Sequence, residues 1–166
     1  GATTVYYTPY QCNQIALYTG TVWKVMTFTE LSIALGSDTT TLPYDVFAYD
    51  NSGTVAIERL AWTNTTTRAT ALTTQDGVYV KTGATDRRYV GTYFTTGTGQ
   101  TTDSFLKRMV WNQDNRVERP LRVLEATNQW DYTTATWRCA NTAGACVNQV
   151  EFVIGLAETQ ATFTVR

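Results

Sequence analysis

Short runs of alternating apolar and polar residues, separated by turn signals, follow one another along most of the chain. The turn signals recur about every 8 to 12 residues, a spacing typical of sandwiches and barrels rather than of alternating strands and helices. The clearest unit is a hairpin in which residues 44–49 lead into the turn Asp50-Asn51-Ser52-Gly53 and residues 54–62 lead out. The pattern therefore predicts an all-β chain.

Further strands are predicted wherever apolar residues cluster or alternate between turn residues. The turns at 75–77 and 83–86 predict two neighbouring strands, and residues 103–112 fit either a short helix or a strand, of which the strand is preferred. The threonine- and glycine-rich residues 95–102 are expected to form a mobile surface loop. The remaining strands are expected at residues 22–28, 31–35, 78–81, 88–94, 121–125, 135–138, 149–155 and 161–165.

So many short strands must close or stack to hide their edges, which favours an antiparallel β-sandwich of jelly-roll type. The 166 residues match the usual size of one domain, and a chain of this length can bury about 70% of its unfolded surface. We therefore expect a single domain over residues 1–166, in which residues 1–20 form an N-terminal arm or a linker from a larger chain.

Composition narrows the possible partners. Charged residues make up only 16% of the chain, against about 25% in typical soluble domains, and threonine takes their place. A formal net charge of -1 argues against nucleic-acid binding, which depends on neutralising phosphates. No apolar run approaches the roughly 20 residues needed to cross a bilayer, so no membrane insertion is expected.

The chain contains no histidine. This absence removes Ser-His-Asp and Cys-His catalysis and the usual nitrogen ligands of zinc or copper. Two carboxylates facing a cleft would still suffice for a glycosidase. However, Asp50 and Asp76 lie where turns need a side-chain acceptor, and Glu58 lies next to Arg59. We predict no catalytic residue, no metal site and no cofactor.

The most site-like group of side chains is aromatic. Trp130, Asp131 and Tyr132 follow Asn128 in a polar stretch, and such rings can stack on sugars, so these four residues are a candidate glycan-binding cluster. The other tryptophans lie within strand-like runs and are expected in the core: Trp23, Trp62, Trp111 and Trp137.

Arginine is concentrated in the second half of the chain. Because arginine favours bidentate contacts and protein interfaces, Arg116, Glu118, Arg119 and Arg122 are candidates for intersubunit or intrasheet ion pairs. A solvated charged face is the alternative, and the sequence does not choose between them.

Three cysteines are present. Cys139 and Cys146 bracket a short polar loop, and a disulfide between them would close a hairpin, stabilising it by about 2.5 kcal/mol on loop-entropy grounds. The two thiols could equally stay reduced. The unpaired Cys12 argues against a dedicated disulfide framework.

Several stretches between Thr21 and Leu156 are together fairly specific, namely residues 44–47, 60–63, 75–84 with 87–92, 110–112 with 115–117, and 133–138. On these stretches the chain resembles a family of domains from structural proteins of tailed bacteriophages, in fibre, tail or head-decorating positions. The resemblance implies a virion component that presents a β-sandwich on the particle surface, commonly as a homotrimer. Its expected partners are other virion proteins or, as the alternative, a host-surface glycan.

The resemblance brings no catalytic motif, so the expected function is a non-enzymatic structural one in particle assembly and host attachment. A carbohydrate-binding module of a larger secreted or virion-associated enzyme is the alternative.

Overall fold

The computed structural model describes residues 1–124, 126, 129, 131–136, 138–139 and 148–157. Every regular element in this part of the chain is a β-strand, and none of its residues belongs to a helix long and apolar enough to cross a membrane. The predicted all-β class is therefore confirmed. The strands are β1 (Thr4–Tyr7), β2 (Gln14–Tyr18), β3 (Trp23–Thr27), β4 (Leu31–Ala34), β5 (Pro43–Asn51), β6 (Thr54–Ala61), β7 (Leu72–Gln75), β8 (Val78–Lys81), β9 (Ala84–Gly97), β10 (Gln100–Thr101), β11 (Lys107–Arg108), β12 (Val110–Asn112) and β13 (Glu151–Phe152).

A seven-stranded antiparallel sheet forms the centre of the molecule. Its strands run in the order β6-β5-β9-β8-β7, and β10 and β12 both pair with β9. The predicted hairpin is its first part, because β5 and β6 pair in register from Tyr44 with Ala61 to Asn51 with Thr54. The Asp50 carboxylate accepts a hydrogen bond from the Gly53 N–H, and Ser52 and Gly53 both have positive φ, so this turn matches its sequence signal.

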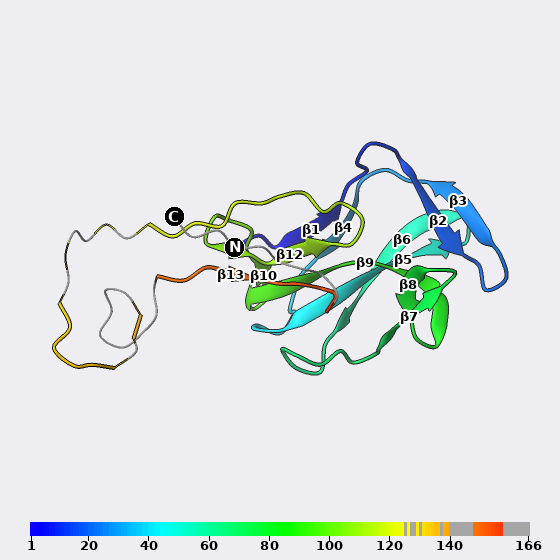
Figure 1. Cartoon of the computed structure of the whole chain (residues 1–166). Coiled ribbons are helices and arrows are strands. Elements are labelled where there is room, and N and C mark those ends of the chain that lie inside the picture. The colour runs from blue at the N-terminus through cyan, green and yellow to red at the C-terminus, as the bar shows by residue number, and fades with distance from the viewer. Residues whose placement is uncertain (125, 127–128, 130, 137, 140–147, 158–166) are drawn as a thin grey trace.

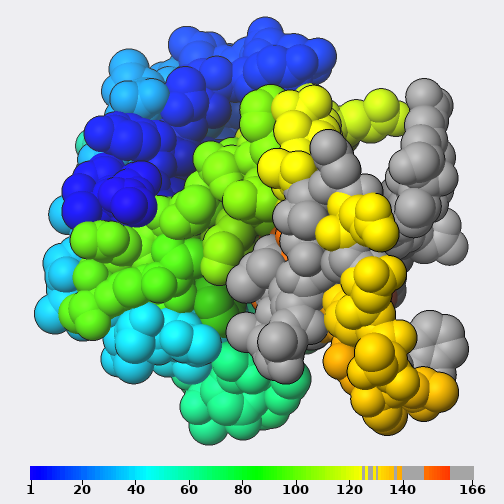
Figure 2. All heavy atoms as spheres, turned by 90° about the vertical axis from the view of Figure 1, so that its left-hand side faces the viewer, coloured from blue at the N-terminus to red at the C-terminus, as the bar shows by residue number. Residues whose placement is uncertain are grey.

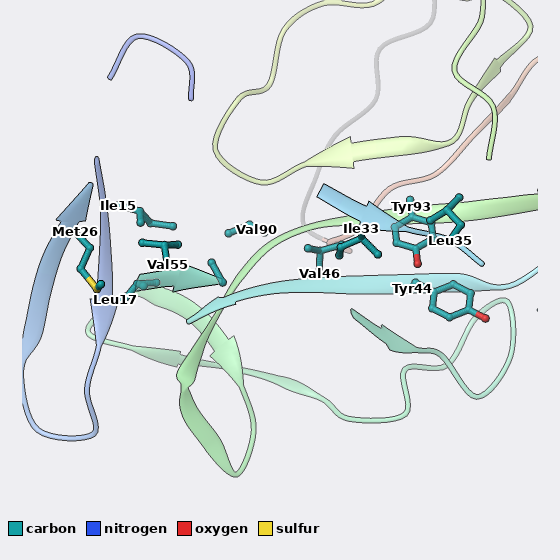
Figure 3. Close-up of a cluster of buried hydrophobic side chains, with 11 residues drawn as sticks. Ile15, Leu17, Met26, Ile33, Leu35, Tyr44, Val46, Val55, Val90 and Tyr93 are labelled. Atoms are coloured by element: carbon teal, nitrogen blue, oxygen red, sulfur yellow. The ribbon is translucent and has the colours of Figure 1, made fainter. Parts of the chain in front are cut away.

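A second layer is formed by two strand pairs, β1 with β4 and β2 with β3. Their apolar side chains meet those of β5, β6 and β9 in one core, and Figure 3 shows this contact between the layers. The resulting antiparallel arrangement fits the predicted β-sandwich, whereas the jelly-roll connectivity stays a prediction. The buried residues of this core are Ile15, Leu17, Met26, Ile33, Leu35, Tyr44, Val46, Ala48, Val55, Val90 and Tyr93.

Residues 1–20 are part of this domain and not a separate arm. They contain β1 and β2, and β2 places Ile15 and Leu17 in the core with 4% and 0% exposure. Ile15 and Leu17 lie on the same face of β2, two residues apart, with the small Ala16 between them on the other face.

The prediction of a mobile loop over residues 95–102 is wrong. These residues continue β9 and turn back as β10, and Thr95 and Thr101 are buried. The Thr95 hydroxyl lies 2.6 Å from the carbonyl oxygen of Thr39, to which it donates, and Leu42 N–H donates to the same hydroxyl. Threonine here provides internal hydrogen bonds, so a composition that resembles a loop builds a buried strand.

The C-terminal third differs most from expectation. Strand is correct for residues 103–112, which contain β11 and β12, and β13 falls within the predicted 149–155. No strand includes the described residues of 121–125 or 135–138, so those two predictions are wrong, and residues 161–165 lie outside the described part. Trp23 and Trp62 are only half-buried rather than core. Trp111 is also half-buried but packs against the buried cluster of Phe47, Tyr89 and Leu156, and Trp137 is not among the described residues.

Candidate functional site

The most elaborate polar centre lies around Asp45 on β5. Its side chain is almost fully buried, and the residue is 1% exposed. Arg68, from the connection between β6 and β7, places its Nε 2.8 Å from one carboxylate oxygen, and the Thr92 hydroxyl on β9 donates to the other at 2.7 Å. Three separate segments therefore meet at one buried carboxylate.

Aromatic rings surround the guanidinium of Arg68. Its Cζ lies 4.5 Å from the centroid of the Trp62 ring and 5.6 Å from that of Tyr89. The Tyr89 hydroxyl is 2.5 Å from the Thr92 hydroxyl, which joins Tyr89 to the same network. These cation–π contacts and hydrogen bonds fix the guanidinium in one orientation.

The network also holds the C-terminal segment against the sheet. Arg68 donates a hydrogen bond to the Gly155 carbonyl oxygen, and Leu156 is buried against Phe47 and Tyr89. A Cβ on Gly155 would overlap the Tyr89 hydroxyl and the Trp111 ring, so only glycine fits this position. The segment after β13 is therefore tied to the body through Arg68.

Burial dominates the electrostatics of this centre. Desolvation raises the pKa of Asp45, while the Arg68 guanidinium and the hydroxyl of Thr92 act in the opposite direction. The Trp62 indole N–H also favours the carboxylate form, although it makes no hydrogen bond of ordinary geometry. Burial likewise raises the pKa of Tyr89. Because Asp45 is almost fully buried, its carboxylate faces protein groups, and the centre holds the connection after β6 and the segment after β13 against the sheet.

A second buried carboxylate, that of Asp38, also joins separate segments of the chain. Asp38 follows β4 and is 7% exposed. Its carboxylate lies 2.8 Å from Arg59 Nε and accepts a hydrogen bond of 2.6 Å from the Tyr93 hydroxyl. Burial and this hydrogen bond both raise the pKa of Tyr93. Arg59 also donates to the Ala34 carbonyl oxygen, so the Asp38 centre links the two layers.

A cavity of about 460 Å³ opens beside Trp62, near the Asp45 centre. Thr65 and Glu151 contribute polar groups to its lining, and Glu151 is 3.0 Å from the ammonium of Lys107. Its volume lies in the range of small-ligand pockets. The other lining residues are largely apolar and include Pro43, Phe94, Met109, Phe152 and Ile154.

The predicted glycan cluster is only partly described. Asn128 and Trp130 lie outside the described residues, whereas Asp131 and Tyr132 are exposed. The Tyr132 hydroxyl donates to the Cys139 carbonyl oxygen at 2.7 Å, and the Arg138 guanidinium lies 4.7 Å from the centre of its ring. Arg138 therefore occupies one face of the ring that was expected to stack on a sugar.

The predicted disulfide lies close to this cluster. The sulfur of Cys139 is disulfide-bonded, whereas Cys146 lies outside the described residues, so the pairing of these two cysteines stays a prediction. Cys12 is free and exposed, as expected for the odd cysteine.

The arginines proposed for subunit contacts make contacts within the chain. Arg116 packs 4.9 Å from the Trp111 ring centre and donates to Gln113, and Arg119 lies 2.7 Å from Asp103. Arg122 lies over Phe105, and Glu118 is exposed. Arg116, Arg119 and Arg122 thus all contact residues of the same chain, and the intersubunit role stays a prediction.

The acidic residues considered for catalysis do not converge in the described part. The Asp50 carboxylate accepts a hydrogen bond from the Gly53 N–H within its own turn. The Asp76 carboxylate accepts a 2.8 Å hydrogen bond from the Trp23 indole N–H, a residue far away in the sequence. Glu58 pairs across the sheet with Lys81 and Arg87 rather than with its neighbour Arg59. Among these described residues no group of three potential ligands could hold a metal ion.

The Asp45 centre was not predicted as a unit. Asp45 appears in the sequence as one acid within a strand, and Arg68 follows three threonines in a turn-like stretch. One signal was available, since an aspartate inside the apolar run 44–49 requires a buried partner. The identity of that partner depends on tertiary pairing, which the sequence pattern does not contain.

Compared with protein-family models, curated proteins and solved structures, the chain matches none of them.

Proposed function

We propose that this chain is a structural, non-enzymatic domain of a tailed-bacteriophage particle, exposed on the virion surface and active as a homo-oligomer in particle assembly. The observation that supports this most is the use of the buried charges. Asp45 with Arg68 and Asp38 with Arg59 each tie separate segments together inside the fold. The two buried carboxylates and their arginines therefore link segments of the domain to one another.

Buried ion pairs that link segments of a domain are suited to a structural component of a particle. A buried ion pair adds little net stability but costs much to break, so it favours one arrangement of the segments it joins. Many threonines of the chain are exposed, so their hydroxyls give the sheets a polar outer surface. The sequence resemblance to phage structural domains points to the same role and adds the trimer as the favoured oligomer.

The direct test is the position of the chain in assembled particles. Cryo-electron microscopy of virions that encode it should place this fold at several symmetry-related sites on the outer surface. Immunogold labelling with an antibody against the purified domain should decorate intact particles. If purified virions lack the polypeptide, the proposal is wrong.

A second candidate function is attachment to a host glycan, and the cavity beside Trp62 is the observation that favours it. Aromatic residues at its wall can stack on a sugar, and Glu151 can accept hydroxyl hydrogen bonds. Thr65→Trp would fill the mouth of this cavity from an exposed position. Glycan-array binding that the wild type shows and this variant loses would support attachment, and unchanged binding would exclude this cavity as the site.

A further inference from the structure

The cavity beside Trp62 lies between the C-terminal segment and the end of the central sheet. Pro43, which begins β5, and Phe94 on β9 contribute to its wall on the sheet side. The other wall consists of five consecutive residues, 150–154, which include β13. Figure 1 shows this segment, in orange, beside β9, and Figure 2 shows the connection between β6 and β7, in blue-green, at the lower edge of the molecule. That connection brings Thr65 to the cavity.

Because side chains of successive residues point to opposite faces of a strand, a cavity lined by five consecutive residues runs along the edge of that strand. The N–H groups of Glu151 and Val153 donate to the carbonyl oxygens of Leu106 and Arg108, so they point toward β11. Successive residues of an extended strand direct their main-chain groups to opposite sides, so those of Ile154 point away from β11. In the described part of the chain neither the N–H nor the carbonyl oxygen of Ile154 has a hydrogen-bond partner. Since Ile154 also lines the cavity, its main chain offers a ligand one donor and one acceptor side by side.

Apolar side chains flank this edge. Met109 is 4% exposed, Pro43 is buried and Phe94 is half-buried, and all three line the cavity. A ligand hydroxyl held against them would lose its hydrogen bonds to water and gain none. A methyl group in the same place would be removed from water, which is favourable. The cavity therefore selects a ligand that carries a donor, an acceptor and an apolar group close together.

The charge of the one acidic group at the cavity is already balanced. The Glu151 carboxylate lies 3.0 Å from Lys107 Nζ and accepts a 3.2 Å hydrogen bond from the Gln149 side-chain amide. A ligand therefore needs no positive charge to approach Glu151. The exposed Thr65 hydroxyl can both donate to and accept from ring hydroxyls of a sugar. These features favour a neutral sugar over one with a free amine.

We propose that the cavity beside Trp62 binds a 2-acetamido sugar and that the acetamido group is the part it recognises. This group is neutral, and it combines an N–H, a carbonyl oxygen and a methyl group in one short substituent. Its N–H and carbonyl oxygen complement the carbonyl oxygen and N–H of Ile154, and its methyl group matches the apolar lining at Met109 and Phe94. A plain hexose has a hydroxyl at this position and supplies no methyl group. The inference rests on the proposed attachment to a glycan and adds the class of sugar.

Matched pairs of sugars test this recognition on the unmodified domain. The methyl glycosides of N-acetylglucosamine and N-acetylgalactosamine are compared with those of glucose and galactose in NMR titrations. One additional hydrogen bond and one buried methyl group should make the acetamido sugars bind about 10-fold tighter or more. In saturation-transfer NMR the acetyl methyl protons should receive the largest share of the transferred magnetisation.

Substitutions at Ile154 test the role of its main chain. Ile154→Pro removes the N–H without breaking a hydrogen bond of the described chain, so the variant should lose most of the preference for acetamido sugars. Ile154→Val is the matched control, because it keeps the N–H and a branched apolar side chain and should keep the preference. Thermal melting checks that both variants are folded, and the sugar pairs on the wild type decide the question if Ile154→Pro does not fold.

The outcomes separate this inference from the function on which it rests. Equal binding of acetamido and plain sugars, lost in Thr65→Trp, would overturn acetamido recognition and leave glycan attachment through the cavity intact. A folded Ile154→Pro variant that keeps the full preference would also overturn it. Binding of neither kind of sugar by the wild type would contradict both.

Discussion

Removing the positive partner of Asp45 should damage the domain more than any surface substitution. Arg68→Met keeps much of the side-chain volume but leaves a carboxylate with 1% exposure without its counter-charge. Breaking a buried ion pair on one side costs about 3–5 kcal/mol. The Arg68 side chain is 20% exposed, so water can partly replace it and we expect about 3 kcal/mol. Loss of the hydrogen bond to Gly155 adds about 1 kcal/mol.

The loss of unfolding free energy in Arg68→Met should be larger at neutral pH than at acidic pH. Burial raises the pKa of Asp45 even with Arg68 present, and without Arg68 the pKa should rise further. A carboxyl whose folded-state pKa is raised binds its proton more tightly in the folded state, so stability falls as pH rises through the interval between the unfolded and folded values. The deficit of Arg68→Met should therefore be largest at neutral pH and shrink toward pH about 4, near the unfolded pKa.

Urea unfolding of the wild type and variants at neutral and acidic pH measures these differences. Arg87→Met is the matched control, because Arg87 also forms an ion pair and a cation–π contact, with Glu58 and Tyr49, but Glu58 is 32% exposed. Arg87→Met should lower the free energy of unfolding by less than about 1 kcal/mol. Asp45→Asn combined with Arg68→Met should recover much of the loss, since no charge is then left buried. If Arg68→Met costs no more than Arg87→Met, the reasoning about Asp45 is refuted.

Three further changes probe other parts of the fold. Above pH about 10 the unfolding free energy should fall by roughly 3 kcal/mol per pH unit, because burial raises the pKa of Tyr89 and Tyr93 and only the unfolded chain ionises them. A free energy of urea unfolding that stays constant above pH about 10 would contradict this. Leu17→Ala should cost about 2–5 kcal/mol in urea unfolding, whereas a Leu17 outside the core would cost almost nothing. Gly155→Ala should cost about 1–3 kcal/mol by overpacking against Trp111, and hydrogen exchange should speed up first in the segment after β13.

Local signals in the sequence were enough to predict the central hairpin. Its turn has Asp50 as acceptor and Gly53 at positive φ, and both requirements are visible in the residues themselves. Alternation over residues 44–62 then sets the register. The all-β class follows from the same kind of local pattern.

Local sequence patterns could not predict the buried Asp45 centre. Asp45 and Arg68 come from different elements, and their contact exists only because the connection after β6 folds back over the sheet. At Thr95 the local composition predicted a loop where the structure has a buried strand. The Thr95 hydroxyl hydrogen-bonds two backbone groups, the Thr39 carbonyl oxygen and the Leu42 N–H, which allows this polar side chain to be buried. Patterns of alternation also predicted strands at 121–125 and 135–138, where the described residues pair with no neighbouring strand.

Native mass spectrometry of the purified domain tests most directly whether this chain is a building block of a larger assembly. One chain has a mass of 18.5 kDa. We predict a closed oligomer at an integral multiple of that mass, with three copies favoured, at physiological ionic strength. A wild-type spectrum that shows only single chains under those conditions would contradict the account.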